Sequence, residues 1–143
     1  MSSEIMDNLA SELKIAISEG KEFRMPVKGT SMLPYIHDGD QVTLVASGNI
    51  KKNDMVFYQR ENGQYVLHRV HHIKDGKYAL VGDHQTFIEY PILKEQVIAK
   101  VKAIHHKGKT KYPKGFLYSL YIWFFRSMFL RKCYFKIYSW VHH

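Results

Sequence analysis

The residues best placed for chemistry lie in segment 27–44, VKGTSMLPYIHDGDQVTL. Ser31 follows a predicted strand and begins a predicted short helical turn, which tolerates Pro34. A serine held there can be both exposed and rigid, although such a serine taken alone is more often a simple N-cap. Nearby backbone N–H groups could polarise a scissile carbonyl group, as an oxyanion hole requires. The residues around this candidate hole are Gly29, Thr30 and Met32.

A histidine able to activate a serine lies in segment 67–70, LHRV. Side chains alternate along a strand, so His68 shares a face with Val66 and Val70 and is expected to point inward. Arg69 points the other way. A near-neutral imidazole is a competent base for a serine hydroxyl group. Taken alone, the pattern also fits a buried histidine with no catalytic role.

Two carboxylates are candidates for orienting this histidine. An imidazole that acts as a base needs an acceptor for its second N–H group. Segment 80–89, LVGDHQTFIE, contains Asp83 and Glu89. Either residue could instead belong to a solvated turn.

Several of these segments resemble one known family. GTSMLP, followed by DGD and the strand QVTL, is similar to the G-x-S-M-x-P…GD-x-V signature of signal peptidase I and the LexA-like self-cleaving repressors. Segment 50–56, IKKNDMV, resembles the family's x-K-x-G-D-x-V strand entry, with Asn53 in place of Gly. The closing strand VIAKV has Ala99 where the family has Gly. The resemblance covers residues 23 to 105.

The identity of the base separates the branches of this family. Bacterial signal peptidase I and the LexA-like proteins use a lysine, whereas the endoplasmic-reticulum and archaeal type has a histidine in an H-R-V motif, which segment 68–70 matches. The resemblance implies that Ser31 is the nucleophile and His68 the base. Asp83 matches the family's Gly-Asp element and is the preferred third member. Glu89, a substitution at the second carboxylate position, is its rival.

The function that the resemblance implies is that of a serine endopeptidase resembling signal peptidase. It would cleave an exposed peptide segment, such as a leader or precursor peptide, after small residues. No cofactor and no metal are expected. The adjacent histidine pairs 71–72, 105–106 and 142–143 have poor geometry for chelation, because neighbours in a strand point to opposite faces. The altered carboxylate positions leave an alternative open: a catalytically degenerate peptidase-fold module that binds a peptide, a membrane or a partner.

The sequence predicts that the elements that position these residues form a mainly β fold, and the resemblance implies that it is of the LexA and signal-peptidase type. Residues 1–22 are expected to form an N-terminal helix, residues 23–107 the catalytic domain, and residues 108–143 a linker and an amphipathic helical tail. Apolar residues every four positions predict a helix over 3–18 that ends near Gly20. Hairpin turns are predicted at 62–63 and 75–76. The predicted strands are 23–27, 41–45, 54–60, 64–73, 77–81 and 96–105.

The tail, residues 116–141, is dense in aromatic and aliphatic residues that four basic side chains interrupt. Its uncharged stretch is too short to span a bilayer. We expect it to lie on a membrane surface, to dock on a membrane-protein partner or to cover the β domain. The net charge of +8 favours anionic partners. The basic residues are Arg126, Arg131, Lys132 and Lys136.

The remaining sequence limits the classes of partner and the expected cellular location. Residues 1–22 are too few for a helix-turn-helix domain, so nucleic acid is not the expected partner. The N-terminal segment sustains no apolar run, and we therefore expect neither a secretory signal nor an anchor there. A cytoplasmic location, at times on the inner face of the membrane, is the expectation. The single cysteine, Cys133, excludes an intrachain disulfide.

Overall fold

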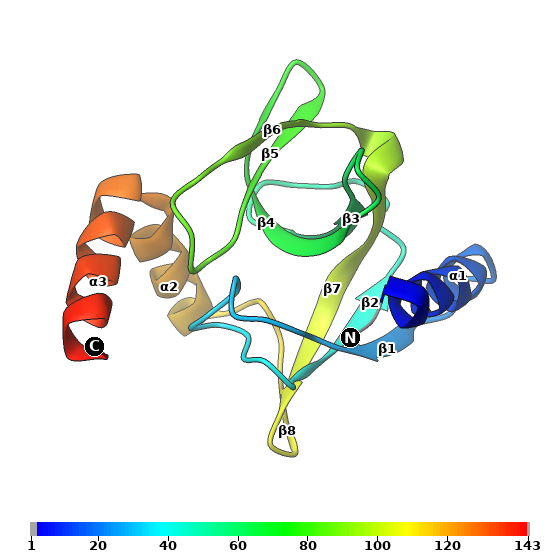
Figure 1. Cartoon of the computed structure of the whole chain (residues 1–143), viewed down its shortest axis with the longest axis horizontal. Helices are drawn as coiled ribbons and strands as arrows, with labels where there is room; N and C mark the ends of the chain where they lie inside the picture. The colour runs from blue at the N-terminus through cyan, green and yellow to red at the C-terminus, as the bar shows by residue number, and fades with distance from the viewer. Residues whose placement is uncertain (1–2, 143) are drawn as a thin grey trace.

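Short antiparallel strands form the body of the molecule in the computed structural model, which describes residues 3–142 (Figure 1). The eight-stranded sheet has the order β1-β2-β7-β3-β4-β5-β6, and β8 pairs with β7. The strands are β1 (Phe23–Pro26), β2 (Gln41–Val45), β3 (Met55–Gln59), β4 (Tyr65–Lys74), β5 (Lys77–Val81), β6 (Glu89–Ile92), β7 (Val97–His106) and β8 (Lys109–Lys111). A 3-10 turn, η1 (Lys94–Gln96), precedes β7. The predicted mainly β fold is confirmed.

All six predicted strands are present, and β6 and β8 are additional. β8 lies in the segment for which a linker was predicted, and it forms a hairpin with β7. The predicted turn between β4 and β5 consists of Asp75 and Gly76, with φ angles of 54° and 72°. Two consecutive left-handed residues match the right-handed twist of the flanking strands, which is why an Asp-Gly pair occupies this turn.

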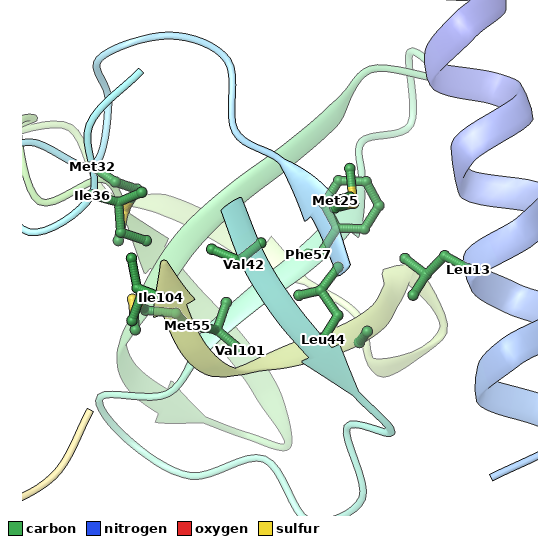
Figure 2. Close-up of a cluster of buried hydrophobic side chains, with 11 residues drawn as sticks. Leu13, Met25, Met32, Ile36, Val42, Leu44, Met55, Phe57, Val101 and Ile104 are labelled. Carbon is green, nitrogen blue, oxygen red and sulfur yellow. The ribbon is translucent and has the colours of Figure 1, made fainter. Parts of the chain in front are cut away.

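The N-terminal helix α1 (Ser3–Ser18) and the loop that carries Ser31 both insert side chains into one core. In Figure 2, Leu13 of α1 reaches the core from one side, and Met32 and Ile36 of the loop reach it from another. Met32 is only 2% exposed, so the residue next to Ser31 is anchored by burial. The buried members are Leu13, Met25, Met32, Ile36, Val42, Leu44, Met55, Phe57, Ala99, Val101 and Ile104.

The tail folds into two helices, α2 (Phe116–Arg126) and α3 (Met128–Val141), at the opposite end of the molecule from α1 (Figure 1). Ser127 separates them in an extended conformation, and its hydroxyl oxygen caps α3 by accepting the N–H of Leu130. One face of α2 is buried through Ile122 and Phe125. None of the helices in the described part of the chain has the length and apolarity needed to cross a bilayer.

We expect Leu13→Ala to lower the free energy of unfolding by about 2–5 kcal/mol, because Leu13 is fully buried against the sheet and its truncation leaves a cavity. Ile15→Ala is the matched control on the same helix, since Ile15 is 59% exposed, and it should change stability by no more than about 0.5 kcal/mol. Urea unfolding followed by circular dichroism measures both. Equal losses for the two variants would contradict the packing of α1.

Candidate active site

The loop between β1 and β2 holds Ser31. Its base is closed by two backbone hydrogen bonds, from Val27 N to Asp40 O at 2.8 Å and from Gly39 N to Val27 O at 2.9 Å. Within the loop, the N–H of Ile36 donates to the carbonyl of Met32 at 2.9 Å, which forms the helical turn that begins at Ser31. The serine is therefore presented on a closed and internally bonded loop.

The loop after β5 packs directly against the backbone of Ser31. The N–H of His84 donates to the Ser31 carbonyl at 2.9 Å. A Cβ atom added to Gly82 would collide with that same carbonyl oxygen. Glycine is needed at position 82 because no larger residue permits this approach. The His84 ring lies between Phe135 and Tyr138 of α3, at ring-centroid distances of 4.8 and 4.9 Å.

His68 lies on β4, is 4% exposed, and belongs to a chain of polar groups. Its Nδ1 atom is 3.3 Å from the hydroxyl group of Tyr58, which donates to Oε1 of Glu89 at 2.6 Å. Arg60 donates from Nε to Oε2 of Glu89 at 3.0 Å. Burial and the positive charge of Arg60 lower the pKa of His68 to about 4, despite the opposing effect of Glu89 and Asp83. The imidazole is therefore neutral at neutral pH.

Glu89 is ionised in this chain. Its partial burial raises its pKa, but the hydrogen bonds from Tyr58 and Arg60 outweigh burial and leave the pKa lowered. Burial and the neighbouring Glu89 raise the pKa of Tyr58, so its hydroxyl group keeps its proton. The proton on Tyr58 is directed at Glu89, and the hydroxyl oxygen is left to accept from His68.

Arg69 and Asp83 form a separate buried ion pair on the other face of β4. Two hydrogen bonds join them, Nε to Oδ1 at 2.8 Å and Nη2 to Oδ2 at 2.9 Å. Tyr121 of α2 donates to Oδ2 of Asp83 at 2.7 Å, and Arg69 donates to the hydroxyl group of Tyr118 at 2.5 Å. The Arg69 guanidinium also lies 5.4 Å from the ring centroid of Tyr35, which belongs to the Ser31 loop. Burial opposes the charge of Arg69, but Asp83 outweighs burial and raises its pKa.

The predicted site residues therefore fall into two networks. Asp83 contacts Arg69 and Tyr121, whereas Glu89 reaches His68 through Tyr58. Within residues 3–142, no hydrogen bond joins the Ser31 hydroxyl group to His68.

The backbone groups of the candidate oxyanion hole differ in their availability. The N–H of Gly29 donates to Asp38 at 2.7 Å. Thr30 is exposed, and its carbonyl accepts the N–H of Leu33 at 3.2 Å. Within residues 3–142, the N–H groups of Ser31 and Met32 donate to no protein acceptor. Those two groups remain able to bind a carbonyl oxygen.

A cavity of about 390 Å³ opens between the segments that lead to Ser31 and His68. Lys28, one of its lining residues, precedes Ser31 by three residues, and Leu67, another, directly precedes His68. Its walls are mainly apolar. The lining residues are Met6, Asp7, Met25, Pro26, Val27, Lys28, Val42, Leu44, Phe57, Gly63, Gln64, Tyr65 and Leu67.

Two strand edges flank this cavity. β1 stands at the end of the sheet order and pairs with β2. β4 pairs with β3 from Tyr65 to Arg69, but its pairing with β5 begins only at Arg69. In the described structure, the first residues of β4 therefore have a strand partner on one side only. Both edges offer backbone groups to an extended segment in the cavity.

Sequence reasoning missed a second cluster, made of His37, Asp40 and His106. Their ligand atoms lie within 4.8 Å of one another, a spacing that could hold a metal ion. The prediction of no metal considered only adjacent histidine pairs, whereas His106 lies 66 positions after Asp40 in the sequence. Asp40 accepts hydrogen bonds from the His37 N–H at 2.8 Å and from His106 Nδ1 at 2.5 Å. Burial raises the pKa of Asp40, but these two contacts outweigh it and lower the pKa. The cluster braces the base of the Ser31 loop.

One comparison with known proteins supports a serine-peptidase type of β fold. The chain belongs to the Peptidase S24-like family, whose model matches residues 2–103. A search of curated proteins found no match. The matched region includes Ser31, His68, Asp83 and Glu89 but not the two tail helices.

Asp83→Asn should lower the free energy of unfolding by about 3–5 kcal/mol, because it leaves the buried Arg69 charge without a carboxylate. Glu19→Gln is the control, since it breaks an exposed ion pair with Lys21 and should cost no more than about 0.5 kcal/mol. Urea unfolding at neutral pH measures both. The double variant Arg69→Met/Asp83→Leu should recover part of the loss, and a mild effect of Asp83→Asn would show that the pair is not buried in solution.

Proposed function

We propose that this protein is a serine endopeptidase of the histidine type, with Ser31 as nucleophile and His68 as general base. The single observation that carries the proposal is the chain from Glu89 through Tyr58 to His68. Membership of a peptidase family supports the reaction class. The histidine in place of a lysine supports the endoplasmic-reticulum and archaeal type of base.

The chain prepares His68 chemically. Because the hydroxyl group of Tyr58 donates its hydrogen bond to Glu89, its oxygen can accept a hydrogen bond from the N–H at Nδ1 of His68. That tautomer leaves a lone pair on Nε2, the atom that must take the serine proton. The depressed pKa, about 4, keeps the ring in its neutral form over the physiological range.

Glu89 is the carboxylate that these contacts favour as the third member of the site. Both oxygens of Asp83 are already held by Arg69 and Tyr121. The Glu89 charge acts on His68 through one hydroxyl group and stabilises the imidazolium that forms during the reaction. Asp83 then supports the site by fixing the loop against which Ser31 packs.

The proposed reaction has two steps, acylation of Ser31 and hydrolysis of the acyl ester. Nε2 of His68 accepts the Ser31 proton as Oγ attacks the scissile carbonyl, and the N–H groups of Ser31 and Met32 stabilise the oxyanion. The imidazolium then gives its proton to the leaving amine, which leaves an acyl ester on Ser31. In the second step His68 takes a proton from a water molecule as that water attacks the ester carbonyl. The imidazolium then returns the proton to the departing Oγ of Ser31, and the acyl group leaves as the new carboxyl terminus of the product.

The substrate proposed is an extended peptide segment with small residues before the cleaved bond. The edges of β1 and β4 can pair with it by β-augmentation, while the apolar walls of the cavity take its side chains. Lys28 lines the cavity three residues before Ser31, so such a segment would run towards the Ser31 loop. A leader or precursor peptide fits this description.

The alternative is a degenerate peptidase-fold module that binds such a segment without cleaving it. The separation of the Ser31 hydroxyl group from His68 in the described structure favours this reading. Catalytic hydrogen bonds often form only when substrate is bound, so a cleavage assay is needed to distinguish the two functions. Peptide binding with no cleavage by the wild-type chain would establish the module.

Ser31→Ala and His68→Ala should each reduce cleavage of fluorogenic peptides with alanine before the scissile bond by about a thousandfold or more. Ser139→Ala and His72→Ala are the controls, because both lie outside the proposed site, and they should keep wild-type rates. Circular dichroism verifies folding. Full activity of Ser31→Ala would reject the mechanism.

On the acidic side, kcat/KM should decline near pH 4 rather than near the ordinary pKa of histidine. His68 must be neutral to act as a base, so the enzyme loses activity as the pH drops through the lowered pKa of His68. Glu89→Gln should move this limb to still lower pH, since the carboxylate opposes the lowering, and should also reduce kcat. Glu95→Gln, at an exposed position, is the control.

Tyr58→Phe should reduce kcat by about tenfold or more with little change in KM, because it removes the Nδ1 acceptor without touching the cavity. Folding is followed at each pH by circular dichroism. If Asp83→Asn, assayed where it is folded, abolishes kcat while Glu89→Gln and Tyr58→Phe do not, Asp83 is the third member instead.

A further inference from the structure

Helix α2 is apolar on both of its faces. One face packs on the β domain through Ile122 and Phe125, which are 7% and 5% exposed. The opposite face carries large side chains in solvent: Phe116, Leu117, Leu120 and Trp123, with exposures of 80%, 79%, 53% and 68%. A helix that is apolar all round is normally covered on all sides. The outer face of α2 therefore lacks a cover within the described chain.

Helix α3 also exposes large apolar side chains, and it adds positive charge. Ile137, Trp140 and Val141 are exposed by 62%, 81% and 63%. Lys132 and Lys136 are exposed and stand eight and four residues before Trp140, so they share its side of the helix. We call these exposed residues of α2 and α3 the tail surface.

The sequence around the tail surface carries one sign of charge. No Asp or Glu follows Glu95, whereas ten lysines and arginines do. Tryptophan and tyrosine favour the boundary between lipid and water, and lysine favours anionic head groups. A face of this composition complements an anionic bilayer better than it complements another copy of a chain with net charge +8.

The dimensions of the helices fit an orientation in the plane of the membrane. α2 has 11 residues and α3 has 14, so neither can cross a hydrocarbon core about 30 Å thick. A short helix with an apolar face and flanking lysines instead lies at the interface, with the apolar face in the boundary region.

We propose that the tail surface docks the protein on bilayers that contain anionic phospholipid, with α2 and α3 lying in the interface. This surface shares no residue with the lining of the apolar cavity, and the proposal does not depend on peptidase activity. The buried face of the same α2 holds Asp83 through Tyr121. Docking would therefore fix the orientation of the whole β domain relative to the membrane.

The chain contains its own reporters for the test. Its only two tryptophans, Trp123 and Trp140, both lie on the tail surface. Tryptophan emission of the full chain is titrated with vesicles of phosphatidylcholine alone or mixed with phosphatidylglycerol. We expect a blue shift, and quenching by brominated lipid, with the anionic vesicles, and release as salt is raised. Unshifted emission with anionic vesicles would overturn the proposal.

Two pairs of substitutions separate the apolar and charged contributions. Leu117→Glu/Leu120→Glu should abolish the shift. Lys132→Gln/Lys136→Gln should weaken binding by about 25-fold, because each lysine near an anionic surface contributes a factor of about five. Ile15→Glu, at an exposed apolar position on α1, is the matched control and should bind like the wild type. Wild-type binding by Leu117→Glu/Leu120→Glu would also overturn the proposal.

The remaining outcomes identify other occupants. A blue shift that grows with protein concentration without lipid, together with a doubled mass in light scattering, would assign the tail surface to a second copy of the chain. Cleavage of a soluble peptide without vesicles should be the same for the tail variants and the wild type. That assay distinguishes a failure of docking from a failure of the proposed peptidase.

Discussion

The buried ion pair between Arg69 and Asp83 is the interaction on which the surroundings of the site depend. Removing two charges from water costs several kcal/mol for each, so such a pair persists only when every polar atom is satisfied. Here Arg69 also donates to the carbonyl of Asn53 and the hydroxyl group of Tyr118, and Asp83 also accepts from Tyr121. The pair thereby ties β4 to the loop after β5 and to α2. That loop in turn contacts the carbonyl of Ser31, so the position of the serine follows from the ion pair.

Strand alternation explains why two adjacent residues of β4 serve different networks. His68 and Arg69 point to opposite faces, yet both are buried, with exposures of 4% and 3%, because the tail covers the face that Arg69 occupies. The low pKa of His68 and the raised pKa of Arg69 reflect this difference in partners. His68 is buried near Arg60 and has no direct carboxylate contact within residues 3–142, whereas Arg69 is paired by two hydrogen bonds with Asp83.

The sequence predicted the elements with strong local patterns and missed those defined by distant partners. The six strands, α1 and the hairpin turns follow from alternation and turn residues. β6 contains Pro91 and β8 has three exposed residues, so neither shows strand periodicity, and each exists because it pairs with a longer neighbour. The inward direction of His68 was predictable, but the Tyr58 link to Glu89 joins residues 31 positions apart. Arg131 was grouped with the surface cations of the tail, yet it is 1% exposed.

The burial of Arg131 shows that support for the site extends beyond the part of the chain that the family match covers. Its guanidinium donates to the carbonyls of Gly82 and Gln85 at 2.7 and 2.9 Å and to that of Phe125, without a carboxylate partner. Burial lowers its pKa, so the position is unfavourable for the charge and is held by the carbonyl groups that surround it. The carbonyls of Gly82 and Gln85 belong to the loop whose His84 N–H donates to the carbonyl of Ser31. The loop is thus fixed between the serine and the tail, and the helices that follow residue 103 are part of what places the serine.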